Sequence, residues 1–402
     1  MSRQMTIALI GCGRFCRSFV PLFRAHPAVR RVYVCDLVRE RARSYAEEFG
    51  VEAIGSFEEA LASPEIDAVG IFTQRYAHGP MVIRALEAGK NVYSAVPCAV
   101  KEEEICRIEE LVRRTRLLYS MGETGYYRAA TVFCRREYAR GSFGRFVYGE
   151  AQYNHDIRNM EESFKSSGGE DWRRYAGVPP MFYPTHSTAM VLGAMPGVYA
   201  TAVSAQGFSG SPRTDIYGQE GQNLYDNPFS NTSMLLKLSD GGVARISENR
   251  CVGWRSPETY ISQFFGTEGC YEFSVAHHHL SRWDPERPGS VVMRDVTREL
   301  APESVSALIE TDYAQAIQKI ADGAGFLETS PIQDTSHLPE SFRGLRNGHN
   351  GTHQYLIDDF CRAYAEGKLT PTHIWQTARF NLPGLVAQRS ALAGGQLMPV
   401  PD

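Results

Sequence analysis

The sequence predicts two domains: an α/β domain with a doubly wound parallel sheet, then an α+β domain with a large, mostly antiparallel open sheet. The chain has 402 residues, more than one ordinary domain holds. Short apolar runs alternate with helix-like segments up to about residue 123, which is typical of a parallel sheet. Beyond that point strand-like runs follow one another with few helices among them. We therefore expect domains at residues 1–123 and 124–402.

The first strand–helix–strand unit contains a glycine-rich turn. An apolar run at residues 5–10 is followed by Gly11-Cys12-Gly13-Arg14-Phe15-Cys16 and then by a helix-like segment. Gly11 lets the strand turn sharply, and Gly13 leaves room for a pyrophosphate beside a helix N-terminus. The third glycine of the usual motif is Cys16, which is small enough for close helix–strand packing.

An acidic residue completes this dinucleotide pattern. The second apolar run, residues 32–35, ends in Asp36, whose carboxylate would accept hydrogen bonds from ribose hydroxyls. A 2′-phosphate at this position would meet a negative charge, so the pattern favours NAD over NADP. Arg39 and Arg41 leave NADP open as an alternative.

The remaining elements of the first domain alternate regularly. Helices are expected at 39–49, 57–62, 78–88 and 102–114, and strands at 68–72, 91–94 and 117–121. Ligands of such a sheet lie beyond the carboxyl ends of the strands. The predicted cofactor-binding residues are therefore Gly11, Gly13, Arg14, Phe15, Asp36, Thr73, Gln74, His78, Val96 and Pro97.

The second domain begins with a helix and continues with strands. The helix is expected at 127–138, and the strands at 147–153, 201–208, 233–238, 243–248, 260–266 and 270–274. A closing helix is expected at 352–366, followed by an irregular tail from residue 391. The polar stretches 156–180 and 209–230 are expected to be long loops, which commonly line sites or are mobile.

Composition excludes several functional classes. A net charge of −4 gives no general affinity for nucleic acid or anionic membranes. The nine cysteines are scattered, without C-x-x-C pairs, which favours a reducing compartment. There is no signal-peptide pattern, and no apolar run approaches the ~18 to 20 residues of a membrane span. We expect a cytoplasmic protein that acts on a small molecule.

Several motifs of the first domain resemble the Gfo/Idh/MocA oxidoreductase family. They are the glycine turn, residues 67–73, residues 88–92 and the tripeptide Ala95-Val96-Pro97. Most members have Glu-Lys-Pro at the tripeptide, and its lysine assists hydride transfer. With Val96 at that place, an ordinary sugar dehydrogenase would lack its usual acid/base.

The second half resembles one branch of that family, the NAD-dependent α-N-acetylgalactosaminidases. The resemblance rests on residues 149–156, Trp172-Arg173, residues 183–186 and residues 348–351. That branch carries Val-Pro in place of Lys-Pro and hydrolyses glycosides by a redox route. The resemblance implies NAD as cofactor, a small glycoside as substrate, and a homo-oligomer, either dimer or tetramer. The sugar stays open: N-acetylgalactosamine, or an acidic or sulfonated hexose such as sulfoquinovose.

The redox route requires proton transfer at two sugar carbons. An ordinary glycosidase needs two carboxylates across the scissile bond, and no such pair stands out in the second domain. In the redox route, oxidation at C3 acidifies the C2 proton, elimination expels the group at C1, water adds, and the hydride returns. We assign His186 to the C3 hydroxyl because histidine titrates near neutrality. We assign Tyr153 to the C2 proton, with its pKa lowered by Arg173 or His155.

Other residues are predicted to contact the sugar. They are His155, Arg158, Trp172, Arg173, Tyr183 and His349. His349 and His353 have the spacing of two metal ligands on a helix, but no third ligand is evident, so no metal is expected. The run His277-His278-His279 is expected to be a solvated loop.

Two alternative functions remain open from the sequence. The first is an NAD(P)-dependent sugar or inositol dehydrogenase that releases NADH, which Val96 argues against. The second is a non-enzymatic NAD-binding protein, which the combination of Tyr153 and His186 argues against.

Overall fold

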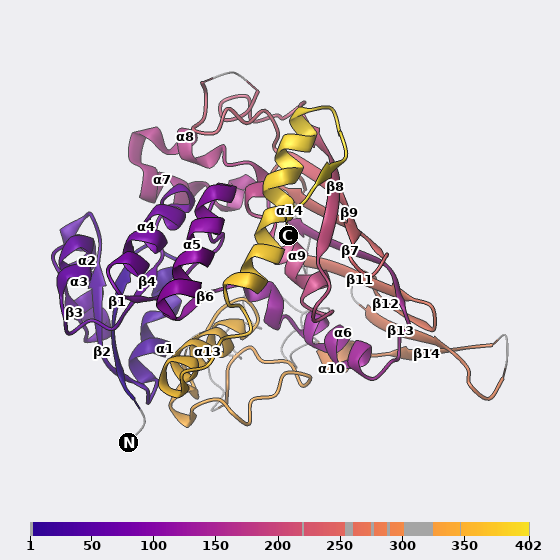
Figure 1. Ribbon diagram of the computed structural model, residues 1–402, viewed down its shortest axis with the longest axis horizontal. Helices are drawn as coiled ribbons and strands as arrows, with labels where there is room; N and C mark the ends of the chain where they lie inside the picture. Colours follow the sequence, from indigo (N-terminus) through magenta and orange to yellow (C-terminus); the bar gives the residue numbers. More distant parts are fainter. Residues whose placement is uncertain are drawn as a thin grey trace. The chain divides into compact units, whose positions relative to one another are not determined.

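The computed structural model describes residues 3–218, 221–253, 260–274, 277–287, 290–300, 325–345 and 347–401 (Figure 1). The chain divides into two compact units. The first unit comprises Met1–Thr124, Ile317–Thr329 and Asp334–Ala378, and the second comprises Gly125–Ala316, Ser330–Gln333 and Arg379–Asp402. The division at Thr124 lies next to the predicted one, but a C-terminal segment joins the first unit. The reason is that the helix Thr352–Glu366 packs against the first strand and first helix of that unit.

The first unit is built on a six-stranded parallel sheet. Its strands are β1 (Met5–Ile10), β2 (Val29–Cys35), β3 (Glu52–Ala53), β4 (Ala68–Ile71), β5 (Asn91–Ser94) and β6 (Tyr119–Met121), in the order β3-β2-β1-β4-β5-β6. Every residue of β1 and β4 is buried, as expected of a sheet covered on both faces. The strand order reverses between β1 and β4, where doubly wound domains bind their ligands.

Helices flank this sheet on either side. They are α1 (Val20–Ala25), α2 (Arg39–Phe49), α3 (Phe57–Ala62), α4 (Arg75–Glu87), α5 (Glu102–Thr115) and α13 (Thr352–Glu366), with short 3-10 turns at Cys16–Ser18 and Glu340–Phe342. The sequence of α5 shows why such a helix forms. Three glutamates occupy its first turn and two arginines its last, which complements the helix dipole, while Ile105, Ile108, Leu111 and Val112 are buried. The predicted helix at 352–366 is confirmed.

The second unit contains a nine-stranded sheet in the order β14-β13-β12-β11-β7-β10-β9-β8-β15. The strands are β7 (Phe146–Asn154), β8 (Ala200–Phe208), β9 (Asn231–Leu238), β10 (Val243–Asn249), β11 (Tyr260–Gly266), β12 (Gly269–Ser274), β13 (His277–Trp283), β14 (Val291–Asp295) and β15 (Met398–Pro399). Neighbouring strands of this sheet pair antiparallel, except that β7 and β10 run parallel. The predicted fold class, a parallel-sheet domain followed by a mostly antiparallel one, is confirmed.

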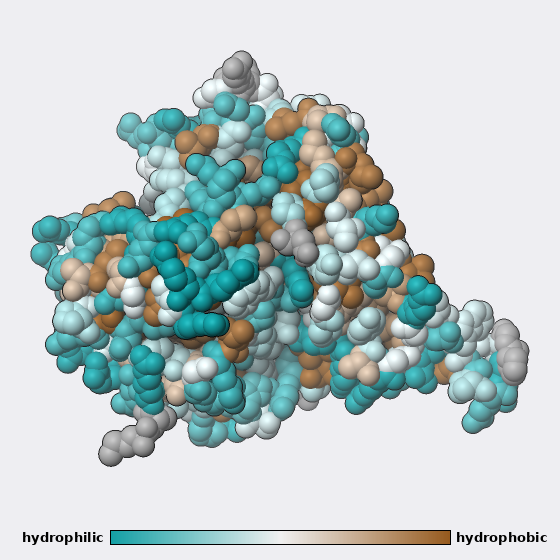
Figure 2. Space-filling view, viewed as in Figure 1, coloured by the Kyte–Doolittle hydropathy of each residue, from teal (hydrophilic) through white to brown (hydrophobic). Residues whose placement is uncertain are grey.

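The two faces of the large sheet differ in what covers them. Helix α9 (Thr185–Leu192) is buried along its whole length and packs on β7, β10 and β11. Strand β9 alternates between buried and exposed residues, and Leu235, on its exposed side, is 52% accessible. In Figure 2, apolar residues gather along the edge where Figure 1 places β8 and β9. The second face of this sheet therefore leaves apolar side chains exposed.

Among the other described helices of the second unit, α6 (Ala129–Ala139) corresponds to the helix predicted at 127–138. Helices α7 (Glu161–Gly168), α8 (Trp172–Ala176), α10 (Thr297–Leu300) and α14 (Ile374–Leu392), which begins in the first unit, were not predicted. The prediction of a long loop at 156–180 is wrong, because α7 and α8 fold around the buried side chains of Phe164 and Trp172. The prediction of a loop at His277–His279 is also wrong, since these residues lie in β13.

Candidate functional site

The glycine turn of the first unit has the geometry that a dinucleotide requires. Gly11 follows β1 with φ +101°, and a Cβ there would lie 2.7 Å from the carbonyl oxygen of Phe72. Around Gly13, by contrast, a Cβ would meet no heavy atom within 4 Å, so the turn leaves open space. The Tyr45 hydroxyl donates to the Gly13 carbonyl oxygen at 2.7 Å and fixes the turn. Cys16 is fully buried, as its predicted packing role requires.

Asp36 is tied to the same turn. Its carboxylate accepts hydrogen bonds from the backbone N–H groups of Cys12 and Val38, both at 2.8 Å. The guanidinium of Arg41 approaches the carboxylate to 3.5 Å. These bonds hold an anionic acceptor beside the open space at Gly13, so the residues present fit a nucleotide with free ribose hydroxyls. The thiol of Cys12 stays protonated, because burial raises its pKa to about 12.

The ends of β4 and β5 are joined by a buried histidine. His78 lies on α4, with Nε2 3.0 Å from the Thr73 carbonyl oxygen and Nδ1 2.8 Å from that of Pro97. Burial lowers the pKa of His78. Its ring therefore fixes two loops at the carboxyl edge of the sheet. Val96, which precedes Pro97 in a cis peptide bond, is buried and apolar and cannot transfer a proton.

His349 belongs to the first unit and contacts the glycine turn. Its ring meets that of Phe15 edge-on, with centroids 5.8 Å apart, and its Nδ1 lies 2.8 Å from Nε2 of His353. His353 is buried and in turn lies 3.1 Å from the Ser18 hydroxyl. The sequence predicted that His349 contacts substrate, and this stays a prediction. Arg14 and Gln74, two predicted cofactor contacts, are exposed and half-buried respectively.

In the second unit, the parallel strands β7 and β10 end side by side and position the predicted catalytic residues. Tyr153 on β7 is in register with Glu248 on β10. The backbone pairing continues past both strand ends, because the His155 N–H donates to the Asn249 carbonyl oxygen at 3.0 Å. Tyr153 and Glu248 are in register on parallel strands, so they project to the same face of the sheet.

Two tyrosine–histidine pairs meet on that face. The Tyr183 hydroxyl lies 2.8 Å from Nε2 of His186, and the Tyr153 hydroxyl is hydrogen-bonded to Nδ1 of His155. The pairs contact each other, since the rings of Tyr153 and His186 meet edge-on with centroids 5.3 Å apart. Tyr153 and His186 are buried, whereas Tyr183 and His155 are half-buried. The structure thus brings together four of the predicted residues.

The sequence did not predict two neighbours of Tyr153, one aromatic and one charged. Tyr260 stacks on the Tyr153 ring with centroids 4.4 Å apart, and the Arg250 guanidinium carbon lies 4.8 Å from its centroid. Burial raises the pKa of Tyr153 well above 10, and Arg250 is the group that lowers it. The prediction that Arg173 or His155 lowers this pKa is therefore wrong.

Trp172, Arg173 and Arg158 occupy other surroundings. Trp172 is 4% exposed and packs in a hydrophobic cluster with Phe164, and its predicted contact with the sugar stays a prediction. Arg173 donates to Asp215 at 2.9 Å. Arg158 donates to Asp156 at 2.8 Å, just beyond β7, and its side chain is 71% exposed. Of these three, only Arg158 follows the Tyr153 strand directly.

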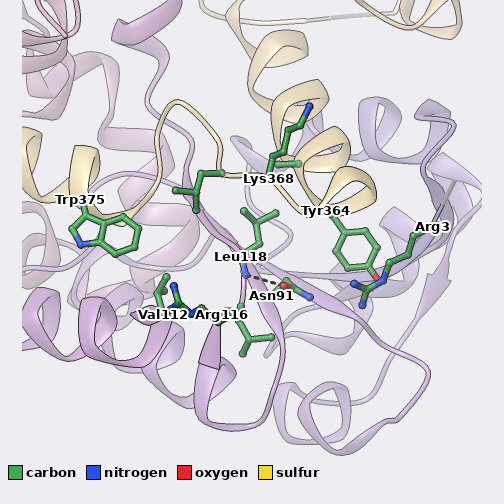
Figure 3. Close-up of a pocket in the computed structure, with 12 residues that line it drawn as sticks. Arg3, Asn91, Val112, Arg116, Leu118, Tyr364, Lys368 and Trp375 are labelled. Carbon is green, nitrogen blue, oxygen red and sulfur yellow. Dashed lines mark hydrogen bonds between the residues drawn. The ribbon is translucent and has the colours of Figure 1, made fainter. Parts of the chain in front are cut away.

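A separate hollow of the first unit lies at the opposite edge of its sheet (Figure 3). It has a volume of about 290 Å³. Its lining includes Asn91, the first residue of β5, whose side chain accepts a hydrogen bond from the Leu118 N–H at 2.9 Å. Two of its cations have partners: Lys368 pairs with Glu366 at 2.8 Å, and Arg3 lies over the Tyr364 ring. This is the amino edge of the parallel strands, so the hollow is not the cofactor site.

Two classes of site find no support in the described part of the chain. No group of three or more histidine, cysteine, aspartate or glutamate side chains there could hold a metal ion. No helix among the same residues has both the length and the apolar character needed to cross a membrane.

Comparison with known proteins identifies the first domain. Residues 5–123 match the family described as oxidoreductase family, NAD-binding Rossmann fold. The N-terminal domain therefore matches the model of the Gfo/Idh/MocA oxidoreductase family. NAD is therefore the cofactor of this Gfo/Idh/MocA domain, in agreement with the sequence prediction.

The curated relatives carry two kinds of name. A glycosyl hydrolase family 109 protein from Streptomyces niveus is 27% identical over 290 residues, which are 66% of this chain and 58% of the relative. The scyllo-inositol 2-dehydrogenase (NAD(+)) of Bacillus subtilis (strain 168) is 30% identical over 171 residues, which are 42% of this chain and 50% of that protein. The chain thus spans less than two thirds of the length of these curated relatives.

Solved structures resemble the chain over its whole length. Levoglucosan dehydrogenase, in complex with NADH and levoglucosan, has a TM-score of 0.72 at 19% identity and covers 100% of both chains. An oxidoreductase from Agrobacterium radiobacter, in complex with NAD+, L-tartaric acid and magnesium, has a TM-score of 0.70 at 14% identity, with 98% of each chain covered. At these identities the likeness establishes the fold of both units.

Proposed function

We propose that this protein is an NAD-dependent glycoside hydrolase that regenerates its cofactor in every cycle. The observation that carries the proposal is the pair of tyrosine–histidine contacts in the second unit, Tyr183–His186 and Tyr153–His155, which touch each other. A simple dehydrogenation needs one base, whereas elimination from an oxidised sugar needs a second one for the C2 proton. The relatives named glycosyl hydrolase family 109 support this reading.

NAD, when bound, would supply the redox chemistry by reversible hydride transfer with a sugar carbon. The glycine turn and Asp36 of the first unit would hold the dinucleotide. In the second unit, His186 accepts the proton of the C3 hydroxyl. Tyr183 holds the ring of His186 through its 2.8 Å contact with Nε2, and so fixes which ring nitrogen faces the substrate.

Tyr153 requires a proton acceptor before it can act as a base. Because burial keeps its pKa well above 10, the side chain is a neutral phenol at pH 7. Its hydroxyl is hydrogen-bonded to Nδ1 of His155. We therefore assign His155 the role of accepting the phenol proton as Tyr153 takes the proton from C2. His155, predicted as a sugar contact, acts in this scheme through Tyr153.

The substrate class follows from the resemblance and from the charge beside the site. N-acetylgalactosaminides are one candidate, and acidic or sulfonated hexosides such as sulfoquinovosides are the other. We propose the exposed guanidinium of Arg158, which pairs with Asp156 at 2.8 Å, as the group that would receive a carboxylate or sulfonate. A panel of aryl glycosides of both classes, each with added NAD, distinguishes them by aglycone release.

The stoichiometry of NAD tests the proposal. We expect many aglycone molecules released per NAD, without net growth of NADH absorbance, and loss of deuterium from a C2-labelled substrate. His186→Ala should abolish turnover while NAD still binds, since His186 lies in the second unit and the dinucleotide residues in the first. Retention of the C2 deuterium, or full activity of His186→Ala, would refute the mechanism.

The alternative function is an NAD(P)-dependent sugar or inositol dehydrogenase. The inositol dehydrogenase relative favours it. Its signature is one NADH formed per substrate molecule oxidised, with no aglycone released. Val96 counts against it, because its buried isopropyl group stands where dehydrogenases of the resembled family place a lysine.

A further inference from the structure

Arg250 is placed at the candidate site by backbone pairing rather than by sequence proximity. It follows β10 directly, and its carbonyl oxygen accepts from the Ile157 N–H at 2.6 Å. That bond extends the parallel pairing of β7 and β10 beyond Tyr153. The backbone of Arg250 is therefore fixed relative to the strand that carries Tyr153.

The side chain of Arg250 is a buried cation with one carboxylate partner. It is 4% exposed and donates to Glu248 Oε2 at 2.9 Å, while Ser187 on α9 donates to Glu248 Oε1. Glu248 is fully buried. Such buried ion pairs are commonly no more stabilising than apolar residues of the same volume. Fold stability is thus a weak reason for a charge here, and the surroundings of the guanidinium supply a better one.

Those surroundings are the two tyrosines of the proposed reaction. The guanidinium carbon lies 4.8 Å from the ring centroid of Tyr153 and 5.6 Å from that of Tyr183. Tyr260, on β11, stacks on Tyr153 with an interplanar angle of 12°. A second buried arginine, Arg128, lies 3.4 Å from the centroid of Tyr260. Tyr153 and Tyr260 therefore form an aromatic pair with an arginine against each ring.

We propose that Arg250 is a positioning residue of this reaction, whose buried guanidinium stabilises the phenolate that Tyr153 forms as its proton passes to His155. The inference rests on the proposed function. Atoms balance within the pair: the O–H bond of Tyr153 breaks, an N–H bond forms at Nδ1 of His155, and the phenolate oxygen then takes the C2 proton. Arg250 keeps its own protons throughout and acts only through Tyr153.

The charged and titratable groups around Tyr153 set the direction of the effect. His155 lies just beyond the end of β7, Tyr260 faces Tyr153 from β11, and His186 faces it from α9. Burial, Tyr260 and Glu248 all raise the pKa of Tyr153, and Arg250 opposes them. Without Arg250, the phenolate forms only at higher pH. A unit charge about 5 Å away in a partly screened interior corresponds to a shift of about one to two pH units.

The test compares Arg250→Gln with Arg250→Lys and with Arg245→Gln. Arg245 is the matched control: it lies on β10, the strand that Arg250 follows, and pairs with a glutamate of β7, Glu150, but its side chain is 46% exposed. In Arg250→Gln we expect kcat to fall at least tenfold at pH 7, and the rising limb of log kcat against pH to move up by about one unit or more. Arg250→Lys should keep the limb near its wild-type position, and Arg245→Gln should leave kcat and the limb unchanged. KM should change less than kcat in all three.

Two further measurements separate a structural failure from a failed inference. Arg250→Gln leaves Glu248 buried without its partner, so the double variant Glu248→Gln, Arg250→Gln is made as well, in which neither charge remains. It should show a smaller upward shift in the same direction, because Arg250 affects Tyr153 more than Glu248 does. Phenolate absorbance near 295 nm, read as the difference between each variant and the same variant with Tyr153→Phe, follows the ionisation without substrate.

These readouts give distinguishable outcomes. If the wild-type protein hydrolyses no glycoside, the proposed function fails, and the absorbance titration still tests whether Arg250 lowers the ionisation midpoint of Tyr153. An unshifted midpoint and an unshifted limb in folded Arg250→Gln or in the double variant would overturn the inference. A shift in Arg250→Lys as large as that in Arg250→Gln would overturn the role of its charge.

Discussion

Replacing Gly13 with alanine separates the folding of the dinucleotide turn from its binding. The substitution adds one methyl group where a Cβ meets no heavy atom within 4 Å and where the backbone is not left-handed. Removing a glycine from the unfolded chain at such a position stabilises a protein by about 0.4–1 kcal/mol. We therefore expect Gly13→Ala to raise the melting temperature of the NAD-free protein slightly.

The same methyl group should weaken NAD binding. It would occupy the open space that the turn leaves for the pyrophosphate, and overpacking of a fitted site costs about 1–3 kcal/mol. That range corresponds to a loss of affinity of about 5- to 150-fold. Isothermal titration calorimetry with NAD measures the affinity, and calorimetric melting without NAD measures the stability.

Gly11→Ala is the matched control, two residues earlier in the same turn. There a Cβ would lie 2.7 Å from the carbonyl oxygen of Phe72, and φ is +101°. The left-handed backbone alone costs about 1–2 kcal/mol, so this variant should lose stability, whether or not NAD is present. Wild-type NAD affinity in Gly13→Ala would refute the placement of the pyrophosphate. Loss of stability in Gly13→Ala would refute the inference that the space around Gly13 can hold a methyl group.

Two further predictions concern the second unit. We expect the exposed face of its sheet to bury against a second copy of the chain. Leu235→Glu, at a 52% exposed position on β9, should therefore lower the mass measured by light scattering. The control Leu392→Glu, at a 59% exposed position on α14, should leave that mass unchanged. Burial lowers the pKa of His278 from 6.5 to about 4. Between those pH values His278 is therefore protonated in the unfolded chain and neutral in the folded chain. Stability should therefore fall as pH drops below 6.5, by about 2 kcal/mol at pH 5, and urea unfolding of His278→Asn should lose that part of the pH dependence.

The first unit could be predicted closely because its information is local. The glycine turn, Asp36 and the buried strands are each encoded within a few residues, and the alternation of strands and helices fixes the sheet type. The tyrosine–histidine pairs also have local signals. Tyr183 and His186 are three residues apart at the start of a helix, and Tyr153 and His155 are two apart at the end of a strand.

The neighbours of Tyr153 could not be predicted, because strand order brings them together. Arg250 reaches Tyr153 only because β10 pairs with β7 in parallel, and Tyr260 only because β11 pairs with β7 from the other side. Neither pairing has a signature in a single sequence. Helices α7 and α8 were missed for a related reason: the polar composition of residues 156–180 hides the few apolar side chains that form a cluster of their own.

Val96 and the two tyrosine–histidine pairs bear on the same chemical question. Val96 can neither give nor take a proton, so the carboxyl edge of β5 leaves proton transfer to other groups. His186 alone could serve the oxidation of a hydroxyl group, and a dehydrogenase would need nothing more. Tyr153 has a pKa that makes it useless as a resting base, yet it is bonded to His155 and lies against the buried cation of Arg250. In this arrangement the phenolate forms only when His155 accepts the phenol proton. Such a base suits the removal of a weakly acidic C–H proton, a step that elimination requires and simple oxidation does not.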